Sequence, residues 1–285
     1  MNSEIISLTD WLKTPPGAYM LAWEQARFDE AVSDVFGYHA LQLGLAELDA
    51  LRANRMPHQW LALSALPGGM PAAPTVQGYP VPERQENRMG PRPVDLLTHP
   101  AALPFAENSL DLLVMPHTLE LSNDPHSALR EVERVLVPEG RVVISGFNPA
   151  SLWGLRQRRD HFLQRFGYHD LFLPQTDEFI GYWRLRDWMR LLSFEVESAH
   201  FGCYRPALTS QHLLNRFGWM DNAGERWWPI FGAVYFLVAV KRVRGMRLLE
   251  PAWKNHKVTA AAPAAVARKE SAPHARSASS TRSTR

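Results

Sequence analysis

The chain has 285 residues, of which 46% are hydrophobic and 21% charged, a balance typical of globular proteins rather than disordered or fibrous ones. Its single cysteine, Cys203, excludes an intramolecular disulfide framework and a multi-cysteine zinc site. The formal net charge of +2 is the sum of two parts of opposite sign. Residues 250–285 hold seven Lys or Arg and two Glu, a net charge of +5, so the rest of the chain has a net charge of −3.

No secretory signal and no membrane span are predicted. The first ten residues carry two acids and no base, the reverse of a signal peptide. The longest apolar run, Pro229–Val240, is shorter than the roughly 20 residues needed to cross a bilayer and predicts a buried strand. Together with the single cysteine, these features lead us to expect a cytoplasmic protein.

The first part of the chain predicts helices followed by two short strands. Residues 1–36 form an expected helical N-terminal segment, in which Pro15-Pro16-Gly17 interrupts the apolar spacing. The expected elements are a helix at Ala22–Val35, a strand at His39–Gly44, a helix at Ala46–Arg55 and a strand at Gln59–Leu63.

Two changes of composition set the expected boundaries. Proline and glycine are too frequent in residues 67–93 for a helix, and this segment predicts a long surface loop that is either functional or a mobile insertion. From residue 249 onward Ala, Pro, Ser, Thr and Arg predominate, a composition that cannot bury a core. We therefore expect a main domain at residues 37–248 and a disordered basic tail at 249–285.

The clearest pattern lies between residues 94 and 145. Apolar runs of strand length flank a segment with helical spacing, and Pro138-Glu-Gly140 is expected to end that helix. A strand, a helix and a strand in quick succession make a βαβ unit, which requires a parallel sheet with right-handed crossovers. The expected elements are strands at Val94–Leu97, Leu110–Met115 and Arg141–Ser145 and a helix at Pro125–Leu136.

The remainder of the domain is less regular. Residues 148–182 are rich in aromatic residues, His and Arg, and predict no regular element. A helix is expected at Arg184–Leu192. Strands at Phe194–His200 and Ala233–Arg242 are expected to complete the sheet.

Five short motifs follow one another between Leu103 and Gly140. They are Leu103-Pro-Phe105, Asn108-Ser-Leu-Asp111, His117-Thr-Leu-Glu120, the helical run Leu129–Leu136 and Pro138-Glu-Gly140. In this order and spacing they resemble the type-11 methyltransferase domain of the class I S-adenosylmethionine-dependent methyltransferases. Gly146-Phe-Asn-Pro149 and Gly154-Leu-Arg156 are similar to a narrower bacterial subgroup. The resemblance covers roughly residues 34–245.

The resemblance implies a fold and an activity. The implied fold is α/β, a doubly wound, Rossmann-like, mostly parallel seven-stranded sheet with an antiparallel last strand. The implied activity is methyl transfer from S-adenosylmethionine to an acceptor that the sequence does not name, because one fold serves many functions. Two alternatives stay open: a catalytically inactive binding or regulatory module, and a protein whose basic tail contacts nucleic acid.

The cofactor motifs depart from the family pattern. The family has an acid and three glycines after its first strand, whereas this chain has Gln42 in place of the acid and Gly44 as the one remaining glycine. No Asp or Glu lies between Asp49 and Glu83, so the acid that binds the ribose hydroxyls in the family is missing or must come from elsewhere. The cofactor contacts that the resemblance implies are Gln42, Gly44, Ser64, His99, Met115, Pro116 and His117.

Acceptor and catalytic residues are harder to assign. His117 is a weak candidate for a general base, because many methyltransferases act by positioning the acceptor for in-line attack. A packing or hydrogen-bonding role is the alternative for His117, and bracing of the turn is the alternative for Glu120. The histidines lack a compact ligand spacing, so no metal is assigned. The expected acceptor contacts, with an aromatic mini-core as the alternative, are Asn148, Trp153, Tyr168 and Tyr182.

Charged residues on the predicted helix at Pro125–Leu136 are given a structural interpretation. Acids and arginines alternate there at spacings that allow pairing along a helix. We expect a solvated, ion-paired face made of Arg130, Glu131, Glu133 and Arg134.

Overall fold

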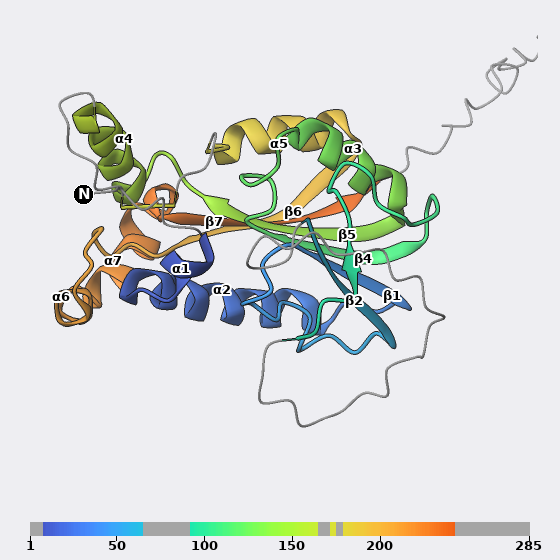
Figure 1. Cartoon of the computed structure of the whole chain (residues 1–285), viewed down its shortest axis with the longest axis horizontal. Helices are drawn as coiled ribbons and strands as arrows, with labels where there is room; N and C mark the ends of the chain where they lie inside the picture. The colour runs from blue at the N-terminus through green and yellow to red at the C-terminus, as the bar shows by residue number, and fades with distance from the viewer. Residues whose placement is uncertain (1–7, 65–91, 165–171, 175–178, 243–285) are drawn as a thin grey trace, which may run out of the picture. The chain divides into compact units, whose positions relative to one another are not determined.

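A seven-stranded sheet with the order β3-β2-β1-β4-β5-β7-β6 forms the centre of the structure, a computed structural model in which residues 8–64, 92–164, 172–174 and 179–242 are described (Figure 1). The strands are β1 His39–Leu43, β2 His58–Leu63, β3 Leu96–Leu97, β4 Leu110–Pro116, β5 Leu136–Phe147, β6 Phe194–Gly202 and β7 Val234–Lys241. The helices are α1 Leu8–Leu12, α2 Pro15–Ser33, α3 Pro125–Val135, α4 Leu152–Gln164, α5 Tyr182–Leu191, α6 Gln211–Arg216 and α7 Trp219–Trp227, with a 3₁₀ turn η1 at Pro229–Phe231.

The pairing of the strands confirms the predicted sheet. Strands β3, β2, β1, β4 and β5 pair with parallel neighbours. The last strand in the chain, β7, inserts between β5 and β6 and is antiparallel to both. The result is a mostly parallel α/β sheet with an antiparallel last strand.

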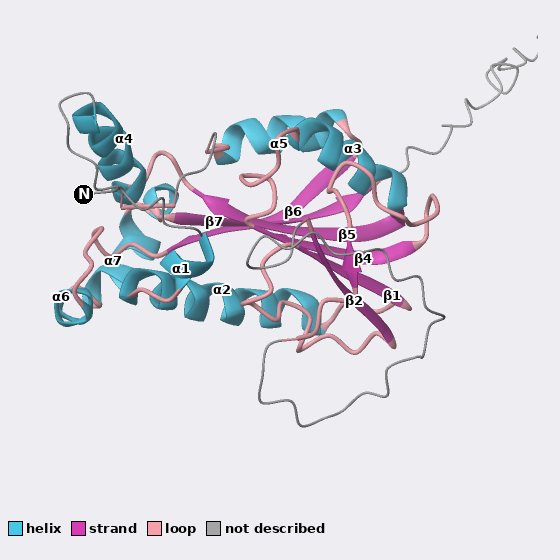
Figure 2. Cartoon of the chain, viewed as in Figure 1, coloured by secondary structure: helices cyan, strands magenta, loops and turns pink. Residues whose placement is uncertain are grey.

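Helices cover both faces of the sheet, as a doubly wound fold requires (Figure 2). The alternation of side chains along a strand divides the core between these faces. On β4, Leu112 and Val114 pack with the buried side of α2, whereas Leu113 and Met115 pack with α3 and α5. Residues 8–36 therefore form part of the core through α1 and α2.

The helix α2 begins where the sequence predicted an interruption. Thr14 is its N-cap and accepts a hydrogen bond from the Gly17 N–H through its side chain. The fixed φ of proline suits the first helical positions, where the missing N–H would have no intrahelical partner. Pro15 and Pro16 therefore start the helix.

Three other predictions of secondary structure are wrong. The segment 46–55 forms successive turns instead of a helix, and residues 152–164, expected to be irregular, form α4. Helix α3 ends at Val135, and Pro138-Glu-Gly140 lie inside β5 rather than at a helix end. The loop at 67–93, apart from its last two residues, and the tail at 249–285 lie outside the described residues. None of the described helices has the length and apolar composition that crossing a bilayer requires.

Candidate functional site

The carboxyl ends of β1, β2 and β3 meet at one edge of the sheet, the edge at which ligands of open α/β sheets bind. The Gly44 N–H donates to the Ala62 carbonyl over 2.8 Å, and the Thr98 N–H donates to the Leu63 carbonyl over 2.9 Å. These bonds continue the parallel ladder past the ends of the strands and bring Gly44, Ser64 and Thr98 to neighbouring positions. We call this the carboxyl edge.

The turn after β1 requires glycine at its first position. Gly44 has a φ of +85°, and Leu45 follows with +44°. A Cβ added to Gly44 would lie 2.7 Å from Thr118 Oγ1, closer than any real Cβ contact. The Thr118 hydroxyl also donates to the Leu43 carbonyl, so the turn after β4 is bonded directly to the end of β1. Gly44 is thus needed both for backbone conformation and for this close approach.

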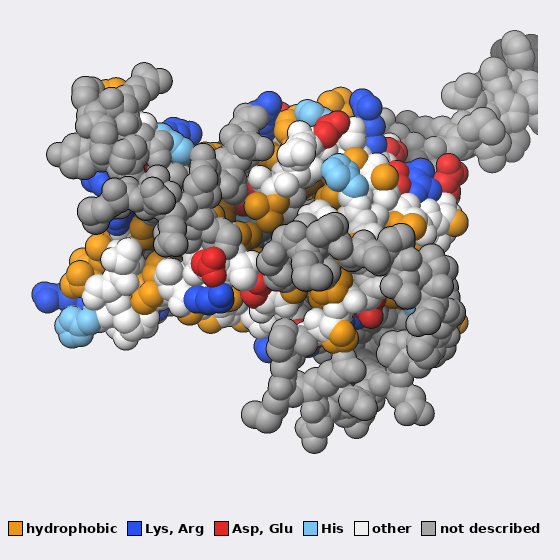
Figure 3. All heavy atoms as spheres, viewed as in Figure 1, with side chains coloured by type: hydrophobic (Ala, Val, Ile, Leu, Met, Phe, Trp, Pro, Cys, Tyr) orange, Lys and Arg blue, Asp and Glu red, His pale blue; other side chains and the backbone are white. Residues whose placement is uncertain are grey.

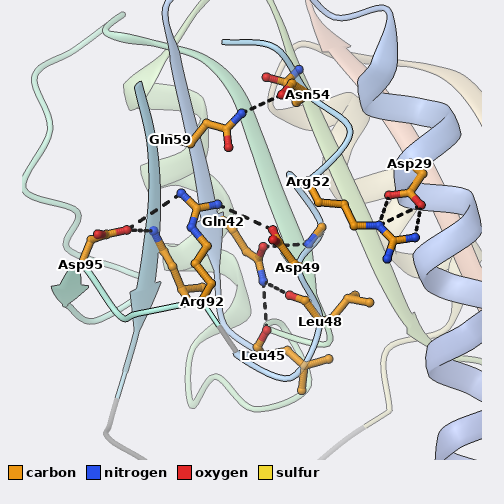
Figure 4. A network of polar contacts seen from close by, with 12 residues as sticks. Asp29, Gln42, Leu45, Leu48, Asp49, Arg52, Asn54, Gln59, Arg92 and Asp95 are labelled. Carbon is orange, nitrogen blue, oxygen red and sulfur yellow. Dashed lines mark hydrogen bonds and ion pairs between the residues drawn. The ribbon is translucent and has the colours of Figure 1, made fainter. Parts of the chain in front are cut away.

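Gln42 holds the rest of that turn in place (Figure 4). Its side chain is fully buried, and its amide nitrogen donates to the carbonyls of Leu45 and Leu48, while its oxygen accepts from the Ala50 N–H over 3.0 Å. These bonds engage backbone groups that a helix would pair internally, which explains why residues 46–55 form turns. In this arrangement the Gln42 side chain binds the protein's own backbone, and its contact with a cofactor stays an untested prediction.

An arginine joins this turn to the segment before β3 (Figure 4). Arg92 lies 3.8 Å from Asp49 and 3.9 Å from Asp95, distances of an ionic contact. Asp95 in turn accepts a hydrogen bond from the Leu61 N–H over 2.8 Å. The two carboxylates therefore brace the β1–β2 region, and the end of β2 itself carries the exposed Ser64.

The remaining expected cofactor contacts divide by exposure. Ser64 and His99 are exposed, and the His99 ring accepts a hydrogen bond from the Ala101 N–H over 3.2 Å. Met115, Pro116 and His117 end β4 and are buried. The sequence thus placed these residues at the carboxyl edge, but only Ser64 and His99 present side chains to solvent there.

A buried ionic cluster lies where β4 ends. His117 Nδ1 lies 2.9 Å from Glu120 Oε2, and His117 Nε2 lies 2.9 Å from Glu24 Oε1 of helix α2. All three side chains are 4% exposed or less. The other Glu120 oxygen accepts a hydrogen bond from the Phe147 N–H, whereas neither Glu24 oxygen has a hydrogen-bond partner among the described residues. We call these three residues the Glu24–His117–Glu120 cluster.

The cluster determines the protonation of His117. Burial lowers the pKa of this imidazole, but the charges of Glu24 and Glu120 outweigh burial and raise the pKa to about 10. At neutral pH the ring is therefore an imidazolium that has no free lone pair to accept a proton. The geometry supports a positioning role for His117, which holds the β4 turn against α2, and its use as a general base stays an untested prediction.

Sequence reasoning did not find Glu24. Met20, Glu24 and Phe28 recur every fourth residue on the buried side of α2, so the carboxylate stands in the middle of an apolar stripe. A charged residue at such a position is the signal that identifies it, because unpaired charges are seldom buried.

The expected acceptor residues are engaged with the protein. The Asn148 amide donates to the carbonyls of Ile230 and Gly232, over 2.7 and 2.9 Å. Trp153 is fully buried and packs against Trp11 in an aromatic cluster, the alternative stated for it. Tyr182 is half-buried against Phe201 and Tyr235, and Tyr168 lies outside the described residues. None of these contacts supports a substrate role, which stays untested.

Two residues of the helical motif bind the segment that follows β3. Glu131 accepts a hydrogen bond from the Leu103 N–H over 2.9 Å. Arg134 donates to the carbonyls of Leu103 and Phe105, over 3.1 and 2.9 Å, and pairs with Glu131 at 2.6 Å. The expected ion pair between Glu131 and Arg134 is present. The same two side chains also bind the backbone of Leu103-Pro-Phe105, and we call this pair the clamp. This clamp is the physical reason for the spacing between the two motifs.

Replacing Arg134 with alanine is expected to lower the free energy of unfolding by about 1–2 kcal/mol, since two backbone carbonyls lose a charged donor. Lysine at this position restores less than half of the loss, because an ammonium cannot reproduce the planar fork of the guanidinium. Chemical denaturation of both variants tests this, with Arg130→Ala on the exposed side of α3 as the matched control. Equal losses for the Arg134 and Arg130 variants would contradict the clamp.

Two hollows lie away from the carboxyl edge, and the larger of them lies at the amino ends of the parallel strands. One has a volume of about 520 Å³ and is lined by residues such as Phe36, Asp111 and Arg242. The other, of about 220 Å³, lies between Arg27 of α2 and Glu197 of β6. Neither contains a residue that the sequence predicted for the site.

Comparison with known proteins matches part of the chain to a family model. Residues 81–144 match the family model described as a methyltransferase domain, a stretch that contains β3, β4, α3 and the first part of β5. This stretch of the chain is similar to a methyltransferase domain. Its motifs carry the residues that end β4 at the carboxyl edge, His117 to Glu120, and the clamp formed by Glu131 and Arg134.

Two curated proteins align with parts of the chain. YafS of Escherichia coli K12, described as uncharacterized, is 40% identical over 153 residues, which are 53% of this chain and 56% of YafS. The malonyl-[acyl-carrier protein] O-methyltransferase of Halorhodospira halophila is 40% identical over 55 residues, 19% of each chain. The chain thus spans little more than half the length of the first relative and a fifth of the second.

Solved structures with similar folds have low sequence identity to the chain. The complex between the Haloferax volcanii Trm112 methyltransferase activator and a methyltransferase matches 85% of this chain and 99% of that chain, with 15% identity and a TM-score of 0.49. An S-adenosylmethionine-dependent methyltransferase from Mesorhizobium loti matches 75% of this chain and 96% of that one, with 13% identity and a TM-score of 0.47.

Proposed function

We propose that the protein is an S-adenosylmethionine-dependent methyltransferase that binds its cofactor at the carboxyl edge. The observation that carries this proposal is the match of residues 81–144 to the methyltransferase domain, because that stretch supplies the end of β4. The structure brings this strand end next to the Gly44 turn through the Thr118 bond to Leu43. The proposed site lies between these two turns.

The residues at this edge partly fit the cofactor. Ser64 and His99 are exposed and suit the polar groups of a nucleoside. The Glu24–His117–Glu120 cluster holds two carboxylates against one imidazolium, and this excess of negative charge favours a cation at the edge. When bound, S-adenosylmethionine would supply an activated methyl group, whose carbon an acceptor nucleophile would attack in line with S-adenosylhomocysteine as the leaving group. The chain's part in that step is to position the two partners.

A second candidate function is a methyltransferase-like binding or regulatory module without activity. Gln42 favours it, because the side chain that replaces the family's acid is fully used by the turn itself. The absence of an acid among the described residues at the end of β2, where Ser64 stands, also favours it. Cofactor binding alone does not separate the two functions, so an acceptor screen must follow.

Calorimetric titration with S-adenosylmethionine and S-adenosylhomocysteine is expected to give dissociation constants in the micromolar range, about −8 kcal/mol. Ser64→Trp should weaken binding at least about tenfold by filling the edge, a loss of about 1.4 kcal/mol. The matched control is Arg55→Trp, since Arg55 is also exposed but precedes the amino end of the same strand. Absence of binding up to millimolar ligand would refute the enzyme and favour the second candidate.

The proposal extends to source and location. The 40% identity with an Escherichia coli protein supports a bacterial origin, and the single cysteine supports the cytoplasm. The methyl acceptor is not assigned.

A further inference from the structure

Large apolar side chains are exposed on the α7–η1 segment. Trp219 is 61% exposed, Trp227 75% and Phe231 54%. Trp228 and Ile230 lie between the last two and are also exposed. Scattered exposed apolar residues are ordinary, but a concentrated group of this kind marks an interaction site. We call Trp219, Trp227, Trp228, Ile230 and Phe231 the aromatic face.

The aromatic face is supported from beneath by hydrogen bonds. The Tyr204 hydroxyl donates to the Pro229 carbonyl over 2.8 Å, and Asn148 donates to the Ile230 carbonyl over 2.7 Å. Arg205 pairs with Asp221 of α7 at 2.9 Å. Gly224, in the middle of α7, is buried against the Tyr204 ring. The exposed aromatics are therefore presented by a backbone that the rest of the domain holds in place.

Basic residues surround this face, although the chain before residue 250 carries a net charge of −3. Residues 205–231 hold three Arg against one Asp and one Glu, and α4 holds three Arg against one Asp, a combined net of +3. The Trp153 indole donates to the Arg205 carbonyl, and Arg156 donates to the Ala207 carbonyl, so α4 adjoins the same region. These two segments therefore carry a net positive charge within a body whose net charge is negative.

The location of this end follows from the sheet. Strand β5 ends at Phe147 and β7 begins at Val234, next to η1, so α4, α6 and α7 gather at the carboxyl end of the central parallel strands (Figure 1). The space-filling view shows hydrophobic and basic side chains meeting at the end where α6 and α7 lie (Figure 3).

We propose that the aromatic face docks onto an anionic phospholipid membrane surface. Tryptophan is favoured at the membrane–water interface, where its apolar ring enters the headgroup region, and arginine is attracted by anionic lipids. A protein partner would have to match both features, whereas an anionic bilayer supplies an apolar layer beneath a negative surface without further specificity. The proposal concerns binding only and is independent of the proposed methyl transfer.

Cosedimentation of the full-length protein with vesicles tests the proposal. We expect binding to vesicles of phosphatidylcholine mixed with phosphatidylglycerol, with a blue shift of tryptophan emission, and at least about tenfold weaker binding to phosphatidylcholine alone. Trp227→Ala/Trp228→Ala and Arg216→Glu/Arg226→Glu should each weaken binding to the mixed vesicles at least about tenfold. The matched control is Phe36→Ala/Tyr38→Ala, which removes two exposed aromatics next to the amino end of β1 and leaves binding unchanged.

Three outcomes would overturn the proposal. The first is no binding to mixed vesicles by folded protein. The second is binding that the aromatic substitutions do not affect, as expected if the basic residues after 250 alone carried it. The third is a dimer, detected by analytical ultracentrifugation without vesicle binding, that Trp227→Ala/Trp228→Ala dissociates; the face would then join two copies of this chain.

Discussion

Replacing His117 with asparagine is expected to lower the free energy of unfolding by about 3–5 kcal/mol, because the two buried carboxylates of Glu24 and Glu120 then lose the cation between them. Asparagine suits the test, since among neutral residues with a side chain it tolerates the positive φ of 52° at this position well. Urea denaturation monitored by circular dichroism measures the loss.

The matched control is Glu24→Gln, which leaves the ion pair between His117 and Glu120 in place. Because the imidazolium keeps Glu120 as its partner and the amide keeps the packing of the glutamate side chain, we expect this variant to lose less than half as much as His117→Asn. Because glutamine has nearly the shape of glutamate, losses of equal size would mean that the ion pair between Glu24 and His117 carries most of the charge stabilisation in the cluster.

The stability difference between the wild type and His117→Asn should also depend on pH. The folded-state pKa of His117, about 10, lies above the unfolded value of about 6.5, so the protonated ring stabilises the folded state. That contribution is complete below about pH 6.5 and is lost as the pH rises through about 10. The gap between the two proteins should therefore narrow over this range, and a constant gap would contradict a charged cluster.

Changing Gln42 to glutamate, the type of residue that the family pattern has there, is expected to destabilise the protein by about 3 kcal/mol or more. A carboxylate cannot donate to the carbonyls of Leu45 and Leu48, and it is repelled by them in a fully buried site. Cofactor binding should fall with stability, because the turn after β1 loses its internal support. Thermal unfolding and calorimetric titration of the same preparation measure both effects.

Gln211→Glu is the control for this substitution, since Gln211 is exposed and donates only to Asn215 on its own helix. It should change the free energy of unfolding by less than about 0.5 kcal/mol. If Gln42→Glu instead bound S-adenosylmethionine more tightly at unchanged stability, position 42 would be a ligand contact and not a brace.

The fold was largely predictable because the strands and amphipathic helices have clear periods. The apolar run at Leu110–Met115 and the helical spacing of Ala128, Leu129 and Val132 both lie where expected. One of the failures has a physical cause that the structure shows, namely a side chain that binds irregular backbone. The bonds from Gln42 to the backbone explain why residues 46–55 do not form the predicted helix. Local helix propensity does not reveal that the amide of one side chain bonds three backbone groups.

The site was less predictable than the fold. The resemblance predicted Gly44, Ser64 and the residues that follow β4 as cofactor contacts, and parallel strands place their carboxyl ends at one edge, but contact with a cofactor stays a prediction. The sequence could not show that His117 would be enclosed by two carboxylates, since Glu24 precedes it by more than ninety residues and comes from another layer. The resemblance gave the residue types at the site. It could not give their contacts, because these depend on which side chains are bound by other parts of the fold.

The bonds of Gln42 have a consequence for protein engineering. Residues 42–50 behave as one exchangeable cassette, because the side chain at the first position binds backbone groups up to the last. Introducing a glycine-rich turn by separate point changes would pass through sequences in which this buried amide has lost some of its partners. A transplant from another methyltransferase should therefore replace the whole cassette in one step, together with Thr118, whose hydroxyl bonds the adjoining end of β1.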